Sequence, residues 1–231
     1  MSDVRSKQTG TIPAPSPMPV DRESWAAQLN LSNFVNTYYQ YRDLQSLGLM
    51  GKSRLLVVGP GQGLHTVLKW RGYEVITVDI DETFRPDYVG SVHDLHMFKD
   101  CDFDAAIASH VLEHLAEPYL DSSLKELARV ARYSLIYLPV HGRHIHLRFI
   151  PGIRNFDWSV IIDLFNPFTT TDGITPRYMA NQHFWEIGLR GYRISDMRKR
   201  MSTFFDVISI YRNRDWIPSQ NFLLKSKSCG L

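Results

Sequence analysis

The hydrophobic pattern divides the chain into short, continuous apolar runs separated by amphipathic segments. The apolar runs are RLLVVG (54–59), YEVITVDID (73–81), FDAAIASHV (103–111), YSLIYLPV (133–140) and a weaker YVGSVHD (88–94). Uninterrupted Val, Ile and Leu are typical of strands covered on both faces. The intervening segments LHTVLKWRG and PYLDSSLKELARVAR have helical spacing. Strands that alternate with helices predict an α/β protein with a parallel sheet between two helical layers.

The two ends of the chain differ from this central pattern. Residues 1–21 are rich in Pro, Ser and Thr and have no apolar period, which predicts a flexible tail. Residues 22–50 carry apolar and aromatic residues at three- and four-residue spacing, which predicts one or two helices. At the other end, 204–211 and 221–226 are two strands around a polar turn. We therefore expect one domain over 22–231, whose sheet is completed by an antiparallel last pair.

After Val140 the alternation of strands and helices breaks down. Residues 141–190 are rich in aromatic and arginine residues without a clear period, and we interpret them as an irregular insertion before the last strand pair. The residues that would suit a planar, glycosidic or anionic ligand are Arg143, Arg148, Trp158, Phe165, Phe168, Tyr178, Phe184 and Trp185. A small satellite core is the alternative. From Asn181 to Met201 the spacing predicts a helix with a break at Gly191, and 191–231 holds the last helix and strand pair.

Composition excludes several classes of protein. Hydrophobic residues make up 44% of the chain and charged residues 22%, with a net charge of +2. So small a charge does not favour a nucleic acid or a membrane surface as partner. No apolar run reaches the roughly 20 residues of a membrane span, and the first twenty residues have no apolar core of a secretory signal. We expect a cytoplasmic protein; the sequence does not indicate its oligomeric state.

The chain has two cysteines, Cys101 and Cys229, far apart in the sequence. They form neither a CxxC pair nor a zinc-binding pattern. This usage favours free thiols in a reducing compartment over a disulfide.

A glycine-rich turn follows the first strand. Gly59, Gly61 and Gly63 are spaced two apart in GPGQG, and glycines at the end of a strand let a ligand approach the backbone. The next strand carries Asp79 twenty residues after Gly59, where a carboxylate accepts hydrogen bonds from ribose hydroxyls. A tight turn with a capping acid is the structural alternative. A dinucleotide turn would place a glycine where Leu64 stands, so the pattern favours a nucleoside without a pyrophosphate.

LLVVGPGQG, VITVDID, GSVHDL and FDAAIASHVLEHL, in this order and spacing, resemble the class I S-adenosylmethionine-dependent methyltransferases, and most closely the small-molecule type with Leu-Glu-His after the fourth strand. The resemblance covers about residues 50–140 and the terminal strand pair. It implies a three-layer Rossmann-like sandwich with a seven-stranded, mostly parallel sheet, in which 51–140 binds the cofactor. The insertion at 141–190 would then cover the methyl acceptor.

The resemblance also implies a set of cofactor-binding residues. The glycines would line the methionine and ribose portions of S-adenosylmethionine, Asp79 would hold the ribose, Ser91 and Val92 would flank the adenine, and Ser109 and His110 would lie near the sulfonium. The complete set is Val58, Gly59, Pro60, Gly61, Gly63, Asp79, Ile80, Ser91, Val92, Ser109 and His110.

The sequence departs from the family at two positions. Val57 stands where the family usually has an acid, and Ser91 stands where it often has Asp, a role that Asp94 could take. These departures keep a non-catalytic binding protein open as an alternative. A nicotinamide-dependent oxidoreductase is the other alternative, because it would use the same glycine turn and Asp79.

Methyl transfer from a sulfonium needs neither a metal nor a covalent intermediate, but an oxygen or nitrogen acceptor can need a base. Histidine titrates near neutral pH, and His110, His141 and His144 lie after the fourth and fifth strands. They are our candidate catalytic residues. His114 is interpreted as structural. His141, His144 and His146 could bind a metal ion, but no carboxylate is nearby in sequence, so no metal site is predicted. We expect O- or N-methylation of a small molecule, with surface-glycan or secondary-metabolite biosynthesis as the candidate settings.

Overall fold

A computed structural model describes residues 12–17, 31–61, 63, 65–149, 158–164, 170–177, 182–213 and 219–230. Of the tail predicted for residues 1–21, only 12–17 are described, and they form no helix or strand. Of the helices predicted for 22–50, only residues from 31 onward are described.

A seven-stranded sheet forms the centre of the molecule. Its strands are β1 (Arg54–Val58), β2 (Glu74–Asp79), β3 (Tyr88–Val89), β4 (Phe103–Ser109), β5 (Ala131–Pro139), β8 (Phe205–Arg212) and β9 (Ser219–Ser226). They lie in the order β3-β2-β1-β4-β5-β9-β8. The first five are parallel, whereas β9 is antiparallel to both β5 and β8. The predicted fold class, including the antiparallel last pair, is therefore confirmed.

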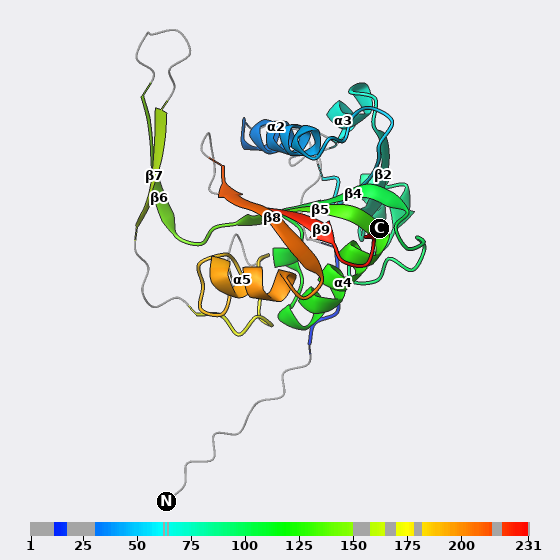
Figure 1. Cartoon of the computed structure of the whole chain (residues 1–231). Coiled ribbons are helices and arrows are strands. Elements are labelled where there is room, and N and C mark those ends of the chain that lie inside the picture. Colours follow the sequence, from blue (N-terminus) through cyan, green and yellow to red (C-terminus); the bar gives the residue numbers. More distant parts are fainter. Residues whose placement is uncertain are drawn as a thin grey trace, which may run out of the picture.

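Helices cover both faces of this sheet (Figure 1). On one side lie α2 (Leu31–Ser46) and α3 (Thr66–Trp70), and on the other lie α4 (Leu120–Val130) and α5 (Ile194–Met201). Three short 3₁₀ helices lie in the loops: η1 (Glu82–Phe84), η2 (Leu112–His114) and η3 (Glu117–Tyr119).

The strand sequences explain this two-sided cover. Successive side chains of a strand point to opposite faces, so Leu55 and Val57 pack in the core beneath α2, whereas Leu56 and Val58 pack in the core beneath α4. All four are less than 8% exposed. Val57, which replaces the family's usual acid, thus lies in an apolar core.

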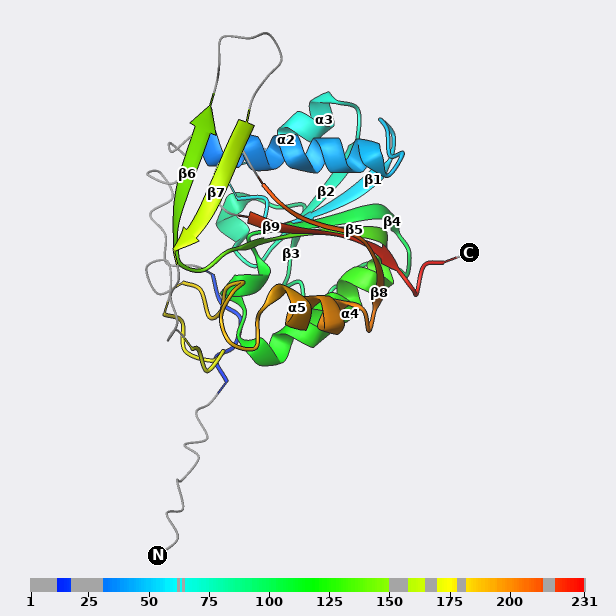
Figure 2. The ribbon, with the colours of Figure 1, turned by 60° about the vertical axis from the view of Figure 1, so that its left-hand side comes forward.

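Residues 141–190 contain a strand pair that the sequence did not predict. β6 (Arg143–Phe149) and β7 (Trp158–Leu164) form a separate antiparallel sheet, with Ile145 opposite Ile162. The hairpin projects beyond the three layers (Figures 1 and 2). Of the aromatic and arginine residues suggested for the acceptor, the side chains of Arg148, Trp158, Phe165, Phe168 and Tyr178 lie outside the described part of the chain.

The segment between this hairpin and α5 corrects a second expectation. A helix was predicted from Asn181, but the described residues 182–192 form turns and isolated bridges, and the helix begins only at Ile194. Gly188 and Gly191 have φ values of +104° and +87°, which a right-handed helix does not contain. Trp185 is completely buried and stacks on Tyr192. The apolar spacing that suggested a helix therefore comes from a segment that packs into the main core.

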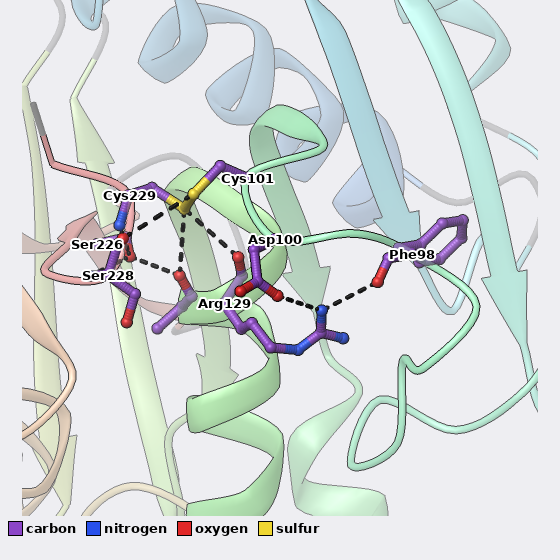
Figure 3. Close-up of a disulfide and its surroundings, with 8 residues drawn as sticks. Phe98, Asp100, Cys101, Arg129, Ser226, Ser228 and Cys229 are labelled. Atoms are coloured by element: carbon purple, nitrogen blue, oxygen red, sulfur yellow. Dashed lines mark hydrogen bonds and ion pairs between the residues drawn. A yellow bond between two sulfur atoms is a disulfide. The ribbon is translucent and has the colours of Figure 1, made fainter.

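The cysteines correct the third expectation, because Cys101 and Cys229 form a disulfide and are not free thiols. The bond joins the loop before β4 to the residues after β9 (Figure 3). The same loop is fixed by Arg129 of α4, whose guanidinium donates to the Phe98 carbonyl and to Asp100. Far separation in the sequence did not prevent pairing, because β4, β5 and β9 are successive strands of the sheet.

No helix in the described part of the chain is long and apolar enough to cross a membrane.

Removing the disulfide should destabilise the protein, because the bond constrains 128 residues of the unfolded chain. We expect the Cys101→Ser/Cys229→Ser variant to lose about 2–5 kcal/mol of unfolding free energy, measured by urea denaturation. Wild-type protein with a reductant should unfold at the same urea concentration as the variant. If oxidised and reduced wild-type protein unfold at the same urea concentration, the bond does not contribute to stability.

Candidate functional site

The carboxyl ends of the parallel strands form one edge of the sheet. In the register of the sheet, Val58 at the end of β1 lies beside Val78 of β2 and Ala108 of β4. The residues that follow each strand are therefore neighbours in space. This places the glycine turn, Asp79 and Ser109 at a common edge, where open α/β sheets bind their ligands.

The turn after β1 has a backbone that favours glycine. Gly59, Gly61 and Gly63 have φ values of +65°, +51° and +76°, and Pro60 lies between the first two. The Gly59 N–H donates to the Val78 carbonyl at 2.9 Å. A Cβ on Gly59 would lie 2.5 Å from Cγ2 of Val111. The first glycine is thus required by the packing of the turn against the segment after β4.

Asp79 is the last residue of β2, and it is half-buried. Its Oδ1 accepts the backbone N–H of Asp81 at 2.9 Å, so the carboxylate shapes its own turn. Ile80 follows and is also half-buried. A carboxylate accepts several hydrogen bonds at once, so this contact is compatible with a second, ligand-binding role.

The predicted adenine-flanking segment lies beyond β3. Ser91 is half-buried and shares a hydrogen bond of 2.7 Å with Nδ1 of His93, whereas Val92 is 2% exposed and packs in the core. Asp94 is exposed and pairs with Nδ1 of His96 at 3.0 Å.

His110 directly follows β4 and has a left-handed backbone, with φ of +56°. Such conformations are costly for residues other than glycine and often occur at functional sites. Its N–H donates to the Tyr137 carbonyl of β5 at 2.9 Å. Its Nδ1 lies 3.5 Å from Oε1 of Glu113, which is long for a hydrogen bond. The imidazole and the carboxylate are therefore neighbours without a well-formed hydrogen bond between them.

Glu113 is the most deeply buried acidic residue of the site. It is completely buried, and neither carboxylate oxygen has a hydrogen-bond partner among the described residues. Burial alone would raise its pKa, but the imidazoles of His110, His114 and His183 lower the pKa below the usual value. Burial lowers the pKa of His114, although Glu113 opposes this. The arrangement keeps a charged carboxylate among imidazoles.

A second carboxylate, that of Glu186, connects His183 to a further histidine, His141. Glu186 is 5% exposed, and its Oε2 accepts from Nδ1 of His141 while its Oε1 accepts from Nδ1 of His183, both at 2.7 Å. His141 lies just after β5, whereas His183 and Glu186 lie in the segment before α5. His183 and Glu186 were not predicted as site residues; their spacing of three residues was the available signal in the sequence.

His144 has a different environment from the other two candidate bases. Its Nε2 donates to the Val140 carbonyl at 3.1 Å, and its Nδ1 accepts from the Arg212 guanidinium at 3.1 Å. Both ring nitrogens are therefore engaged in hydrogen bonds. The geometry thus separates His144 from His141, which contacts a carboxylate.

A pocket opens between α2, β7 and β8. It is lined by Tyr39, Arg42, Asp43, Ser46, Leu47, Ile161, Ile208, Ser209, Ile210, Tyr211, Arg212, Asn213 and Leu223. Asp43 is 2% exposed and accepts from the hydroxyls of Tyr137, at 2.5 Å, and of Tyr211. Burial and the Asp43 carboxylate raise the pKa of both tyrosines. Arg212 connects this pocket to His144.

Comparisons with known proteins agree with this geometry. Residues 56–134 match the family model described as a methyltransferase domain. This range contains the glycine turn, Asp79, His110 and Glu113. The chain has the fold of the class I S-adenosylmethionine-dependent methyltransferases. No curated protein matches the sequence.

Solved structures share this methyltransferase fold at low sequence identity. The PH0226 protein of Pyrococcus horikoshii OT3 is 14% identical, with a TM-score of 0.55 over 88% of this chain and 96% of its own. The 1,6-didemethyltoxoflavin-N1-methyltransferase of Burkholderia thailandensis, solved with S-adenosylhomocysteine, is 14% identical, with a TM-score of 0.51 over 92% and 94%. The cyclase SpnF is 12% identical, with a TM-score of 0.52 over 82% and 81%.

Replacing Gly59 should test how tightly the turn is packed. We expect Gly59→Ala to reduce the unfolding free energy by about 3 kcal/mol, because the new methyl group meets Val111 and the backbone is left-handed. Gly63→Ala is the matched control, since its φ is also positive but its Cβ would have no atom of another described residue within 4 Å; it should lose about 1 kcal/mol. Equal losses, measured by urea denaturation without cofactor, would contradict the packing argument.

Proposed function

We propose that this protein transfers a methyl group from S-adenosylmethionine to an oxygen or nitrogen atom of a small molecule. The observation that carries the proposal is the convergence at one sheet edge of the glycine turn, Asp79 and the left-handed His110. The turn leaves its backbone open to a nucleoside, and Asp79 would accept from the ribose hydroxyls. His110 would shape the space beside the sulfonium.

The remaining cofactor contacts are assigned by the same proposal. Val58, Pro60 and Ile80 would contact the nucleoside beside the glycines and Asp79. Ser91 and Val92 would flank the adenine, with the Val92 backbone as the contacting group because its side chain is buried in the core. Ser109 would lie with His110 near the reacting methyl group.

In the reaction, the lone pair of the acceptor attacks the methyl carbon. The bond from carbon to sulfur breaks, and its electron pair stays on sulfur, which gives S-adenosylhomocysteine. The acceptor's proton passes to a base. Among the three candidate histidines we assign this role to His141, because the Glu186 carboxylate orients its ring and stabilises the imidazolium that forms.

The acceptor would bind between the β6–β7 hairpin and the body of the domain. The pocket beside Arg212 supports this placement, because Ile161 of β7 contributes to its lining. Arginine and tyrosine side chains suit a planar or anionic acceptor. One fold neighbour is named as an N-methyltransferase of a small molecule. We propose surface-glycan or secondary-metabolite biosynthesis as the setting and the cytoplasm as the location. Because Cys101 and Cys229 form a disulfide, free thiols no longer support a cytoplasmic location. Cell fractionation would test it.

Cofactor binding tests the proposal directly. In calorimetric titrations we expect S-adenosylhomocysteine to bind and NAD not to bind. Asp79→Ala should weaken S-adenosylhomocysteine binding about ten- to a hundredfold, because hydrogen bonds to a charged group contribute about 1.5–3 kcal/mol. Asp206→Ala is the control, as Asp206 is exposed on β8 at the other edge of the sheet. Binding of NAD alone would favour an oxidoreductase, and binding of neither would overturn the proposal.

The assignment of the base gives a separate prediction. In assays that detect S-adenosylhomocysteine formation with a panel of phenols, amines and sugars, His141→Ala should lower kcat about a hundredfold or more. Cofactor affinity should remain unchanged. His144→Ala is the matched control and should have a small effect, because both of its ring nitrogens are already engaged. A larger loss for His144→Ala than for His141→Ala would reverse the assignment.

A further inference from the structure

Glu113, His114 and His183 bring one potential ligand atom each within 4.8 Å of the others, and they are the only such group in the described part of the chain. Glu113 and His114 belong to η2 after β4, whereas His183 lies in the segment before α5. Two hydrogen bonds hold these segments together: the Phe184 backbone N–H donates to the Glu113 carbonyl at 2.8 Å, and the Trp185 indole donates to the Leu115 carbonyl at 3.1 Å.

Both imidazoles are oriented through the same ring nitrogen. Nδ1 of His183 donates to the Glu186 carboxylate at 2.7 Å, and Nδ1 of His114 donates to the Gln182 carbonyl at 3.1 Å. A hydrogen on Nδ1 leaves the lone pair of Nε2 for a further ligand. Carboxylate and carbonyl acceptors at the second nitrogen are the usual outer contacts of metal-binding histidines. The ring centroids lie 4.7 Å apart.

The third side chain, Glu113, accepts no hydrogen bond from the described residues. A buried ionised carboxylate is costly unless it is hydrogen-bonded, paired or bound to a metal. Both oxygens of Glu113 lack a hydrogen bond among the described residues, and the nearest imidazole nitrogen outside the group, Nδ1 of His110, is 3.5 Å away. A divalent cation at the centre of the group would satisfy the carboxylate and both imidazoles.

We propose that Glu113, His114 and His183 bind a divalent transition-metal ion such as Zn²⁺. Two imidazole nitrogens and one carboxylate oxygen form a ligand set that Zn²⁺ accepts, and three protein ligands leave one coordination position for water or another ligand. The ion joins the turn after β4 to the segment before α5. Its ligands differ from His141, His144 and His146, the histidines that the sequence suggested as possible metal ligands. The disulfide cysteines are not ligands of this ion. Cys101 precedes β4 and Glu113 follows it, so the disulfide and the proposed site lie at opposite ends of that strand.

Metal titration of the full, untagged chain tests the inference. After dialysis against a chelator, and without a reductant, the protein should bind one equivalent of Zn²⁺ in competition with a chromophoric chelator. One equivalent of Co²⁺ should give visible ligand-field absorption. At a free Zn²⁺ concentration a hundred times its Kd, the Tm should rise by roughly 5 °C or more.

Variants identify the ligands. Glu113→Gln and His183→Ala should each abolish stoichiometric binding, and Glu186→Gln should weaken it about ten- to a hundredfold by releasing the His183 ring. His96→Ala is the matched control, because its side chain is 77% exposed and pairs only with Asp94 on the surface. Circular dichroism would verify folding; if one ligand variant does not fold, the other still decides. The proposal would be overturned if the wild-type protein did not bind the metal stoichiometrically, or if Glu113→Gln and His183→Ala bound it as tightly as the wild-type protein does. None of these readouts depends on methyl transfer.

Discussion

The burial of a parallel sheet on both faces governs how every other part of this molecule is arranged. Parallel strands need helical cover on each side, and here consecutive residues such as Leu55 and Leu56 belong to the two different cores. Because the strands are parallel, their carboxyl ends meet at one edge. The turns that follow them cannot be buried in either core, so they are the places where the chain can present polar groups to a ligand.

Buried carboxylates organise the side chains at this edge. Glu113 lies among three imidazoles, and Glu186 connects His141 to His183. The two acids belong to segments that are far apart in the sequence and are joined by backbone hydrogen bonds. In a region with little water, each carboxylate fixes the orientation of the histidines around it more strongly than a surface acid would. Nδ1 of His141 and Nδ1 of His183 therefore both donate to Glu186, although turns supply most of the residues at this edge.

The parts of the chain outside the central sheet distinguish this protein from others with the same fold. The β6–β7 hairpin exposes Ile145, Leu147, Ile162 and Leu164, and the pocket beside it is lined from α2, β7 and β8. Neighbours with the same fold are named as an N-methyltransferase and as a cyclase, so the fold alone does not determine the reaction. In the function proposed above, the surface of the hairpin, α2 and the segment before α5 would select the acceptor.

Local hydrophobic patterns were enough to predict the central sheet. Uninterrupted apolar runs indicated its parallel strands, the glycine spacing indicated the turn after β1, and FDVISIY and NFLLKS indicated the antiparallel pair. Contacts between distant segments, in contrast, depended on the tertiary fold. The prediction of a helix from Asn181 was wrong. The apolar spacing around Trp185 comes from side chains packed in the core and not from a helix. Cys101 was predicted to be a free thiol, since nothing in the sequence shows that β4 and β9 lie near each other. The sequence also did not predict that Glu113 and His183 lie close together. The two residues are far apart in the chain, and a local pattern does not specify which distant segments the fold brings together.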